Sequence, residues 1–504
     1  MPEGAHEKHY FSHEDVRKRF DACRGKTLGE IDKTGVFSGK PKNKGVAGAV
    51  VEQSILGYPP DSRQEPDIEI DGIPYEVKTT GLVLEKKRRP KGGKKSPVLH
   101  RAELNQLEAK EPMSITAVSV EGIWKEEFPT SAFWHKLEHM LIAYYLYNEG
   151  IPKKVESVQE YAQFPYIDYE LHEWNDDDKS VLEADWTMVR DFVARVHQEN
   201  LNPDKEYPKI SHELNRSLLY MDTSPKWPNK PRWRLKRSTV TALVKEHFAR
   251  NEFERLPVRI GSYLDIEQLC RDIRADYAGS TVEELAHELG YSGSLSGKSV
   301  NEGLIVRMFG GSGKKMSRID AFVKAGIQCK SVTLAKGEAR LSEDMKYVRI
   351  DFNEVMDEGV TWEETGVREA FNGRILCAVF TEPSEEAPLK DNVFEGFKWI
   401  SFDEETFDEA QRVWEEVRRL VVAGELRDVP CLRKDGTQII NKNGVPRSAP
   451  NFPKAKDAHA VFVRGDSSNS AKKTLMVNGI KMYIQYLWLR KDWVAGELGK
   501  APFL

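Results

Sequence analysis

Cysteine is scarce in this sequence. Its 504 residues include five cysteines, and none of them form a Cys-x-x-Cys pair. Disulfide frameworks and thiolate zinc sites both need suitably spaced cysteines, so the pattern argues against both and favours a reducing compartment. The five are Cys23, Cys270, Cys329, Cys377 and Cys431.

Long apolar runs are also missing. The longest run near an expected helix is "MLIAYYLY" at 140–147, which is far too short to cross a bilayer. The first twenty residues are polar and contain no apolar core of a signal peptide. We therefore expect a soluble protein with no membrane partner.

An overall positive charge is absent too, since the formal net charge is −5. Basic residues are instead concentrated locally. "KKRRPKGGKK" at 86–95 holds seven of them, and "KWPNKPRWRLKR" at 226–237 holds six with two tryptophans interleaved; neither contains an acid. Such stretches supply phosphate contacts in nucleic-acid-binding proteins, although each one alone could equally be a solvated loop.

Five sequence segments of the first half have similar counterparts in the second half, in the same order. Helical and strand patterns interleave in both halves, which predicts two homologous α/β domains. We place them at 1–250 and 262–504, joined by a linker at 251–261. The matched segments are "RGKTLGEI" (24–31) with "AGSTVEEL" (278–285), "NKGVAGAVVEQSILG" (43–57) with "GKSVNEGLIVRMFG" (297–310), "PDIEIDGIPYEVKTT" (66–80) with "IDAFVKAGIQCKSVT" (319–333), "DWTMVRDFV" (185–193) with "VWEEVRRLV" (413–421), and "WRLKRSTV" (233–240) with "WLRKDWV" (488–494).

The third matched segment reads as a hairpin in the first half. Apolar residues alternate on both sides of Asp71-Gly72, a favoured two-residue turn. Counting outward from that turn places Asp67 opposite Glu76, with Lys78 on the same face. Two carboxylates that close repel each other, and a divalent cation with an ammonium alongside would relieve the repulsion. A solvated polar strand face is the simpler alternative, and Pro74 weakens the register by removing a ladder donor.

The second copy differs at these positions. It keeps Asp320 and Lys330, but Gln328 stands where the first copy has Glu76, and the turn is one residue shorter. Glutamine is a poor metal ligand beside a carboxylate, so we expect a degenerate, catalytically dead site.

These motifs together resemble the MutH and Sau-type branch of the PD…ExK restriction-endonuclease superfamily. Pro66-Asp67 and Glu76-Val77-Lys78 match its signature literally. "NKGVAGAVVEQSILG" is similar to the family's Lys-Gly-x-x-Gly-x-x-x-Glu helix, and "WHKLEHML" at 134–141 to its His-Lys-Leu segment. The resemblance covers most of 20–250 and, more weakly, about 275–500. It implies two tandem MutH-like restriction-endonuclease-fold domains, each a mixed central sheet flanked by helices.

The resemblance implies catalytic roles for five residues: Glu52, Asp67, Glu76, Lys78 and Lys136. Mg²⁺, for which Mn²⁺ could substitute, would be held by Asp67, Glu76 and the backbone carbonyl of Val77. Glu52 would hold a second metal or fix Lys78. Lys78 would orient the attacking water or take its proton, and Lys136 would contact the scissile phosphate or that water.

The resemblance and the basic stretches together predict a set of DNA-binding residues: Lys44, Lys86, Lys87, Arg88, Arg89, Arg234, Lys236, Arg237, Arg490 and Lys491. Arg234 departs from the mismatch-repair relative, which has an aromatic residue there on its DNA-facing surface. In the second copy, Ala370 falls at or near the position of Lys136, and Ile305 or Val306 at that of Glu52. Three of the five catalytic positions are thus lost.

The implied function is a type II restriction endonuclease, of the type IIE class in which a second site acts allosterically, cutting double-stranded DNA at GATC on the 5′ side of the G. It implies self-association as a dimer at the cut site, a separately encoded DNA methyltransferase and a cytoplasmic location in a bacterium. Two alternatives stay open: a MutH-like strand-nicking mismatch-repair endonuclease, and a non-cleaving sequence-specific DNA-binding regulator.

Two other motifs are weaker. "GGSGKK" at 310–315 lacks the spacing and the final Ser/Thr of a phosphate-binding P-loop. His135 and His139 have helical spacing, but Lys136 stands where a zincin needs its glutamate, so a helix surface is the better interpretation.

Overall fold

The computed structural model divides the chain into two compact units. Unit 1 comprises 1–150 and 155–252, and unit 2 comprises 151–154 and 253–504. The structure describes residues 9–38, 45–59, 65–84, 99–148, 157–224, 227–249, 253–297, 299–335, 341–384, 387–433, 435–441, 444–467 and 473–504.

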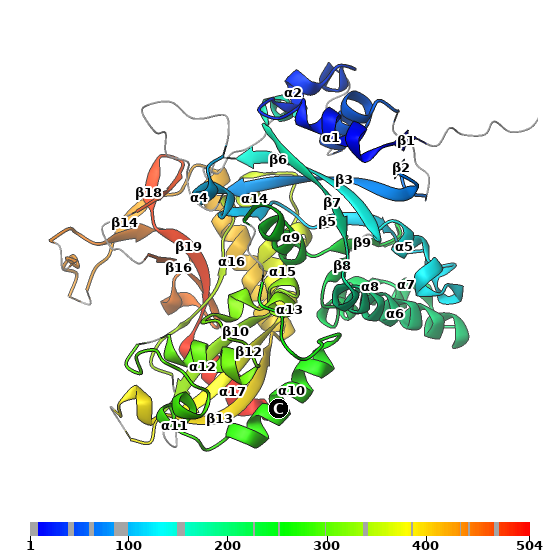
Figure 1. Cartoon of the computed structure of the whole chain (residues 1–504). Coiled ribbons are helices and arrows are strands. Elements are labelled where there is room, and N and C mark those ends of the chain that lie inside the picture. The colour runs from blue at the N-terminus through cyan, green and yellow to red at the C-terminus, as the bar shows by residue number, and fades with distance from the viewer. Residues whose placement is uncertain are drawn as a thin grey trace, which may run out of the picture. The chain divides into compact units, whose positions relative to one another are not determined.

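Unit 1 is built around a mixed six-stranded sheet with the order β1-β2-β3-β6-β7, in which β4 also pairs with β3. β3 runs parallel to β6 and antiparallel to β2, while β6 runs antiparallel to β7. In Figure 1, α1 and α2 lie above this sheet and α9 lies below it. The predicted α/β fold with a mixed central sheet flanked by helices is confirmed. The strands are β1 (Tyr10–Phe11), β2 (Ile68–Ile70), β3 (Ile73–Leu84), β4 (Leu107–Ala109), β6 (His139–Asn148) and β7 (Tyr166–Glu173).

The β2–β3 hairpin has the predicted register. Ile70 pairs with Ile73 and Ile68 pairs with Tyr75. Asp71 (φ 46°) and Gly72 (φ 88°) both adopt positive φ, as a type I′ turn requires. Because this turn twists in the same sense as the strands, it fixes the register that brings Asp67 towards Glu76.

The helices of unit 1 begin with side-chain caps that the sequence supplies. Ser12 and Thr27 each form a capping box with the acid three residues later, and Asn175 caps the longest helix. That helix buries Val181, Trp186 and further apolar residues at helical spacing. The helices are α1 (His13–Asp21), α2 (Leu28–Ile31), α3 (Val46–Val50), α4 (Arg101–Leu104), α5 (Ala132–His135), α6 (Asp176–Gln198), α7 (Pro203–Glu206), α8 (Pro208–His212) and α9 (Arg237–Ala249).

A smaller antiparallel sheet completes unit 1, with β9 (Arg232–Leu235) between β5 (Met113–Ala117) and β8 (Met221–Thr223). The buried side chain of Asp185, on α6, connects this smaller sheet to the rest of unit 1. Its carboxylate accepts hydrogen bonds from the backbone N–H groups of residues 219, 220 and 221, at 2.8–2.9 Å. These bonds fix the start of β8 against the long helix.

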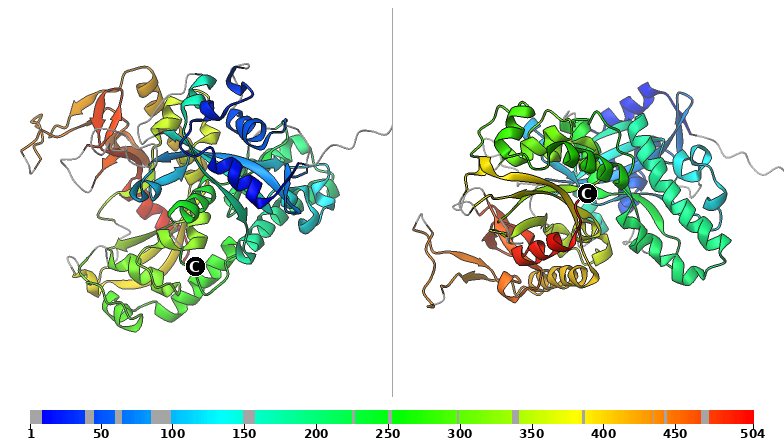
Figure 2. Two further views of the ribbon diagram at one scale, coloured as in Figure 1. Left: turned by 45° about the horizontal axis from the view of Figure 1, so that its top comes forward. Right: turned by 90° about the horizontal axis from the view of Figure 1, so that it is seen from below.

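Unit 2 contains two three-stranded sheets. In the first, β12 (Arg374–Thr381) lies between parallel β10 (Gln328–Leu334) and antiparallel β13 (Val393–Ser401). In the second, β19 (Ile484–Leu489) lies between β11 (Met345–Arg349) and β16 (Val461–Asp466). The right panel of Figure 2 shows the first sheet, ending in yellow β13, between the green helices and the red α17.

The helices of unit 2 are α10 (Tyr263–Tyr277), α11 (Val282–Glu288), α12 (Val300–Met308), α13 (Asp320–Lys324), α14 (Phe352–Met356), α15 (Gly366–Asn372), α16 (Glu404–Val422) and α17 (Lys491–Lys500). Its remaining strands form two short antiparallel pairs: β14 (Asp428–Pro430) with β15 (Ser448–Pro450), and β17 (Leu475–Val477) with β18 (Ile480–Met482). One hydrophobic core cluster of unit 2 includes Trp362, Phe371 and Trp414.

The two units repeat the same connections. Leu235 of β9 pairs with Met113 and Met221, and Leu489 of β19 pairs with Met345 and Val461. Each middle strand leads directly into a helix, α9 or α17.

Both units also contain a buried acidic side chain that accepts hydrogen bonds from the backbone at the start of a strand. Glu409 of α16 accepts from the N–H groups of residues 459, 460 and 461 at the start of β16, as Asp185 does at the start of β8. Thr27 and Thr281 both open capping-box helices. Both also form a bridge, to Pro165 and Val393 respectively. These shared contacts are what a duplication predicts.

One expectation for the second copy is wrong. The segment matched to the β2–β3 hairpin does not begin as a strand, because Asp320–Lys324 is the helix α13 and only β10 follows as a strand. This segment lacks the Asp-Gly turn and the apolar alternation of the first copy. Asp320 and Lys324 instead form an ion pair at helical (i, i+4) spacing, 3.0 Å apart.

Candidate active site

The hairpin holds the carboxylate of Asp67 beside the strand that carries Glu76. Asp67 Oδ2 accepts a hydrogen bond from the backbone N–H of Val77 at 2.9 Å. Burial, together with the negative charge of Glu76, raises the pKa of Asp67 to about 6. The two carboxylates therefore crowd each other, as the sequence predicts.

Glu76 is bound by two lysine side chains at once. Its Oε1 lies 2.7 Å from Lys78 Nζ, and its Oε2 lies 2.9 Å from Lys136 Nζ. The glutamate and Lys136 are buried, with 5% and 8% of their side chains exposed, and 15% of the Lys78 side chain is exposed. The two ammonium groups offset the cost of burying this carboxylate.

Lys136 comes from a different part of the sequence and also fixes the segment before Asp67. It directly follows the short helix α5, which Ser131 caps by accepting from the N–H of Trp134. Besides Glu76, its ammonium donates to the backbone carbonyl of Glu65 at 3.1 Å. Sequence reasoning did not find this role of Glu65, because a backbone acceptor leaves no mark in residue type.

Glu52 lies on the helix next to β3. It belongs to a π-helical turn, Val51–Leu56, which continues α3 and ends at Gly57 in the left-handed conformation. A Cβ at Gly48 of α3 would lie 3.8 Å from Thr79 Oγ1 of β3, so helix and strand are in close contact. The catalytic role of Glu52 stays a prediction, and Lys44 lies outside the described residues.

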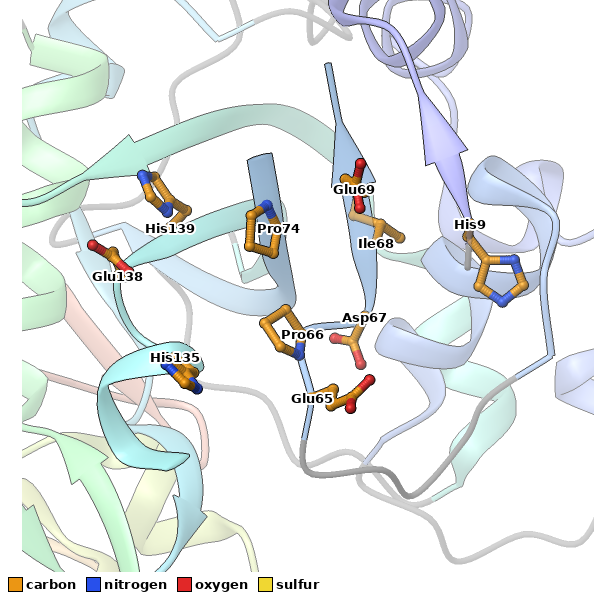
Figure 3. Close-up of a pocket in the computed structure, with 10 residues that line it drawn as sticks. All are labelled: His9, Glu65, Pro66, Asp67, Ile68, Glu69, Pro74, His135, Glu138 and His139. Carbon is orange, nitrogen blue, oxygen red and sulfur yellow. The ribbon is translucent and has the colours of Figure 1, made fainter. Parts of the chain in front are cut away.

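A pocket of about 270 Å³ opens beside Asp67. Figure 3 shows Glu65, Asp67 and Glu69 on its hairpin side and His135, Glu138 and His139 on the side of α5 and β6. His135 is exposed at the end of α5, but His139 begins the strand β6, so the expected helix surface shared by the two histidines is wrong. The pocket gives solvent and small groups access to the Asp67 carboxylate.

The residues present fit a magnesium ion. Within the described ranges, no group of three or more His, Cys, Asp and Glu side chains is arranged to hold a metal. Mg²⁺ does not need such a cage, because it is commonly bound by one or two carboxylates together with waters and substrate phosphates. Asp67 and Glu76 supply two carboxylates, and burial, followed by the charge of Glu76, raises the pKa of Asp67, so a cation bound here would favour its ionised form.

The basic residues of the β9–α9 junction are engaged within unit 1. Arg234 forms a bidentate pair with Asp222, with both distances 2.7 Å, and is 8% exposed. Lys236 donates to the carbonyl of Leu218 at 2.6 Å, and Arg237 donates to that of Ala109 at 2.8 Å. Their DNA contacts stay predictions, and Lys86, Lys87, Arg88 and Arg89 lie outside the described residues.

Arg490 makes in unit 2 the contact that Lys236 makes in unit 1. Its Nη1 donates to the carbonyl of Ala458 at 2.7 Å, three residues before β16 begins. Leu218 likewise lies three residues before β8. The backbone N–H of Lys491 donates to Asp344. The equivalence gives Arg490 a structural role, and DNA binding by Arg490 and Lys491 stays a prediction.

Among the described residues of unit 2, the segment matched to the candidate site shows no glutamate held between two lysines as Glu76 is in unit 1. Gln328 pairs with Ile375 in the strand register where Glu76 pairs with Met140. Lys136 lies four residues before Met140, and the residue four before Ile375 is the apolar Phe371, next to Ala370. Phe371 therefore occupies the position of Lys136. Lys330 lies in β10, where burial lowers its pKa. Ile305 and Val306, the candidates for the Glu52 position, are both buried.

The "GGSGKK" loop binds a carboxylate of its own unit. The N–H groups of Ser312 and Gly313 and the hydroxyl of Ser312 all donate to Glu254. This intramolecular partner accounts for the loop without a nucleotide.

No helix in the part of the chain that the structure describes is both long and apolar enough to span a bilayer. A family model described as "DNA mismatch repair enzyme MutH" matches residues 56–185, a span that includes Asp67, Glu76, Lys78 and Lys136. The type II restriction enzyme Sau3AI of Staphylococcus aureus is 23% identical over 483 residues, which cover 91% of this chain and 89% of that protein.

Proposed function

We propose that this chain, a site-specific restriction nuclease with a MutH-like domain, makes Mg²⁺-dependent double-strand cuts in DNA at GATC, on the 5′ side of the G. The observation that carries the proposal is the Glu76 carboxylate held between Lys78 and Lys136, with Asp67 beside it. All four residues lie within the MutH match. The GATC specificity and the cut position rest on the similarity to Sau3AI and MutH.

Asp67, Glu76 and the backbone carbonyl of Val77 are the groups that would hold the metal, with Glu52 as an additional ligand. Bound there, Mg²⁺ or Mn²⁺ would supply charge neutralisation at the phosphate and an acidified water. The chain's own contribution is to keep two carboxylates and two ammonium groups preorganised around one phosphate.

Lys78 and Lys136 then act on the reacting atoms. The contact of Lys78 Nζ with Glu76 Oε1 at 2.7 Å fixes this amine beside the carboxylate pair, where it would orient the attacking water or take its proton. Lys136 is placed to contact the scissile phosphate. Water oxygen forms the new bond to phosphorus and the bond to the 3′ oxygen breaks, which leaves a 5′-phosphate and a 3′-hydroxyl.

Unit 2 would be a degenerate second copy that binds DNA without cutting it. Its connections follow those of unit 1, while Gln328, Phe371 and the Asp320–Lys324 pair leave no equivalent of the Glu76 cluster. Such a unit would make the enzyme type IIE, with a DNA-bound second site that regulates the first. Two chains would meet at the palindrome, because one site per chain cannot cut both strands without repositioning. A separate methyltransferase would protect host DNA in a bacterial cytoplasm.

Sequencing the ends of plasmid fragments cut with Mg²⁺ tests the reaction and its specificity together. We expect every end to begin with a 5′-phosphorylated GATC. Lys78→Ala should cut less than about a hundredth as fast, the loss expected for a group positioned on the attacking water. It should still bind DNA in Ca²⁺, which separates catalysis from binding. Ends without GATC would refute the specificity, and full activity of Lys78→Ala would refute the site.

A strand-nicking mismatch-repair endonuclease is the second candidate, favoured by the description of the matched family. Nicked circles that accumulate only when mismatch-repair proteins are added would support it over the restriction activity. Linear plasmid formed by the purified chain alone would exclude it.

A further inference from the structure

Unit 2 carries a projecting β-structure between α16 and β16, which we name the arm (residues 427–451). Figure 1 shows it in orange, extending away from the rest of unit 2 around β14. Beyond the β14–β15 pair, Cys431, Ile439 and Arg447 connect three adjacent segments. Cys431 N–H donates to Arg447 O at 2.9 Å, Ile439 N–H to Cys431 O at 2.8 Å, and Arg447 N–H to Ile439 O at 2.7 Å. The described part of the arm is therefore a narrow β-structure held by backbone hydrogen bonds.

The arm has almost no core of its own. Nine large apolar side chains are exposed among the described residues of the whole chain, and five of them lie between 422 and 476. On the arm itself, Leu432, Val445 and Ile440 are 57%, 53% and 50% exposed. Small isolated ribbons are only marginally stable in water. Exposed apolar residues grouped on such a ribbon mark a surface that another molecule covers.

The charge of the arm indicates what that molecule is. Its sequence holds five basic and two acidic residues, in a chain whose net charge is −5. Both acids are already engaged: Asp428 lies 3.3 Å from Lys473 Nζ, and Asp435 accepts from the N–H and hydroxyl of Thr437. Arg433 and Arg447 are exposed on the described part of the ribbon. A cationic ribbon on an acidic protein is complementary to a polyanion.

A ribbon of this kind fits a groove of duplex DNA. Away from the three joined segments, the chain pairs two by two at the antiparallel bridges Leu432–Gln438 and Ile440–Pro446. The major groove of B-DNA admits such a two-stranded β-ribbon, and leucine or isoleucine side chains can contact thymine methyl groups or wedge between base steps. We propose that the arm is the DNA-reading element of unit 2, with Arg433 and Arg447 on phosphates and Leu432 and Ile440 at the bases. This inference rests on the proposed nuclease function and gives unit 2 a DNA contact that does not require the structurally engaged Arg490.

Two double variants of the full chain test the two kinds of contact. Arg433→Gln with Arg447→Gln removes two charges, and Leu432→Ser with Ile440→Ser removes apolar surface without a change of charge. Arg412→Gln and Leu264→Ser are matched controls, because Arg412 is exposed on α16 and Leu264 is 70% exposed on α10. All six side chains are on the surface, and unchanged thermal melting will show that each of the four variants is folded.

Binding is measured by fluorescence anisotropy with a 24-base-pair GATC duplex in Ca²⁺, over a range of salt concentrations. We expect the arginine pair to weaken binding about tenfold near 0.15 M salt and to reduce the salt slope by about two, since each lost phosphate contact removes about 0.9. The apolar pair should weaken binding with an unchanged slope. The controls should bind like the wild type.

Three outcomes overturn the proposal or separate it from the function on which it rests. Wild-type affinity and slope in both arm variants would refute it. Suppose instead that, without DNA, sedimentation gives the arm variants a different oligomeric mass from the wild type, while their DNA affinity is unchanged. This result would show that the arm joins two chains and does not bind DNA. If neither the unmodified chain nor the arm variants bind or cut GATC DNA, the proposed nuclease function itself is refuted.

Discussion

Lys136 Nζ lies 2.9 Å from Glu76 Oε2, although 60 residues separate the two in sequence. Both side chains are buried. The opposite oxygen of the same carboxylate accepts from Lys78, so this glutamate is in direct contact with two ammonium groups. Asp67, the other acid of the site, accepts a hydrogen bond from the backbone N–H of Val77, yet burial and the charge of Glu76 outweigh this bond and the nearby ammonium groups and raise its pKa to about 6.

This asymmetry predicts stability changes of opposite sign for the two acids. Glu76→Gln leaves the buried ammonium of Lys136 and the partly exposed one of Lys78 without their carboxylate partner and should lower the free energy of unfolding by about 3–5 kcal/mol. Asp67→Asn should raise it. The folded-state pKa of Asp67 exceeds its unfolded value, so its ionised form costs free energy above pH 6, up to about 3 kcal/mol for a shift of about two units.

Urea denaturation at pH 8 with EDTA measures both effects. Asp67→Asn should also lose the rise in melting temperature that Mg²⁺ gives the unmodified chain, because one ligand is gone. Equal destabilisation by both variants would contradict the assignment of a single uncompensated carboxylate.

His247 predicts a different pH dependence. It lies on α9, with Nδ1 3.0 Å from Glu170 Oε2 and Nε2 3.5 Å from Asp168 Oδ2. Burial alone would lower the pKa of His247, but hydrogen bonds to Asp168 and Glu170 raise it to about 9. A raised pKa contributes stability that is complete below the unfolded value near 6.5 and is lost as the pH rises through 9.

His247→Gln should therefore be less stable than the unmodified chain by about 2–3 kcal/mol at pH 6, with the gap closing by about pH 10. Unfolding free energies at these two pH values test this. A gap that is independent of pH would mean that His247 stabilises by packing, for instance against Tyr144, whose ring lies 5.6 Å away.

The degenerate site of unit 2 should not be restored by one substitution. Gln328→Glu returns one carboxylate, but Phe371 supplies no ammonium where Lys136 stands in unit 1, and Asp320 is paired with Lys324. In a full chain inactivated by Asp67→Asn, Gln328→Glu should give no Mg²⁺-dependent nicking of plasmid DNA. Nicking by that double variant would show that unit 2 retains catalytic competence.

The register of the β2–β3 hairpin could be predicted from the sequence because it depends on neighbouring residues alone. Asp71-Gly72 permits a turn with two positive φ values, and the alternation of Ile68, Ile70, Ile73 and Tyr75 sets the faces. The second copy lacks both signals, and a local Asp320–Lys324 pair favours a helix there instead. The match to a strand was therefore wrong for 320–324.

Non-local contacts explain what the sequence did not reveal. Arg234, Lys236 and Arg490 look like phosphate ligands when counted as basic residues, yet each has a partner far away in sequence: Asp222, Leu218 and Ala458. Lys136 was located only through the family resemblance, since no spacing rule links it to Glu76. The arm was missed because its scattered basic and apolar residues form a surface only once the ribbon has folded.

The number of GATC sites on a plasmid should affect the rate at which it is cut. The Glu76–Lys78–Lys136 cluster occurs once in the described part of each chain, and the proposed palindromic duplex has two scissile strands, so double-strand cutting without repositioning would bring two chains together at the cut site. If unit 2 holds a second GATC duplex, its binding can favour the cutting state of unit 1, with a coupling that must be reciprocal in binding. We therefore expect plasmids with two or more GATC sites to be cut faster per site than one-site plasmids. The rate should also depend sigmoidally on enzyme concentration.

A short GATC duplex added in trans should rescue cutting of the one-site plasmid, and a duplex of scrambled sequence should not. The arm variant with Leu432→Ser and Ile440→Ser should lose this rescue, because the duplex added in trans would bind unit 2 through the arm. Equal rates per site on both plasmids, with no effect in trans, would refute the regulatory role of unit 2 and leave the catalytic assignment of unit 1 in place.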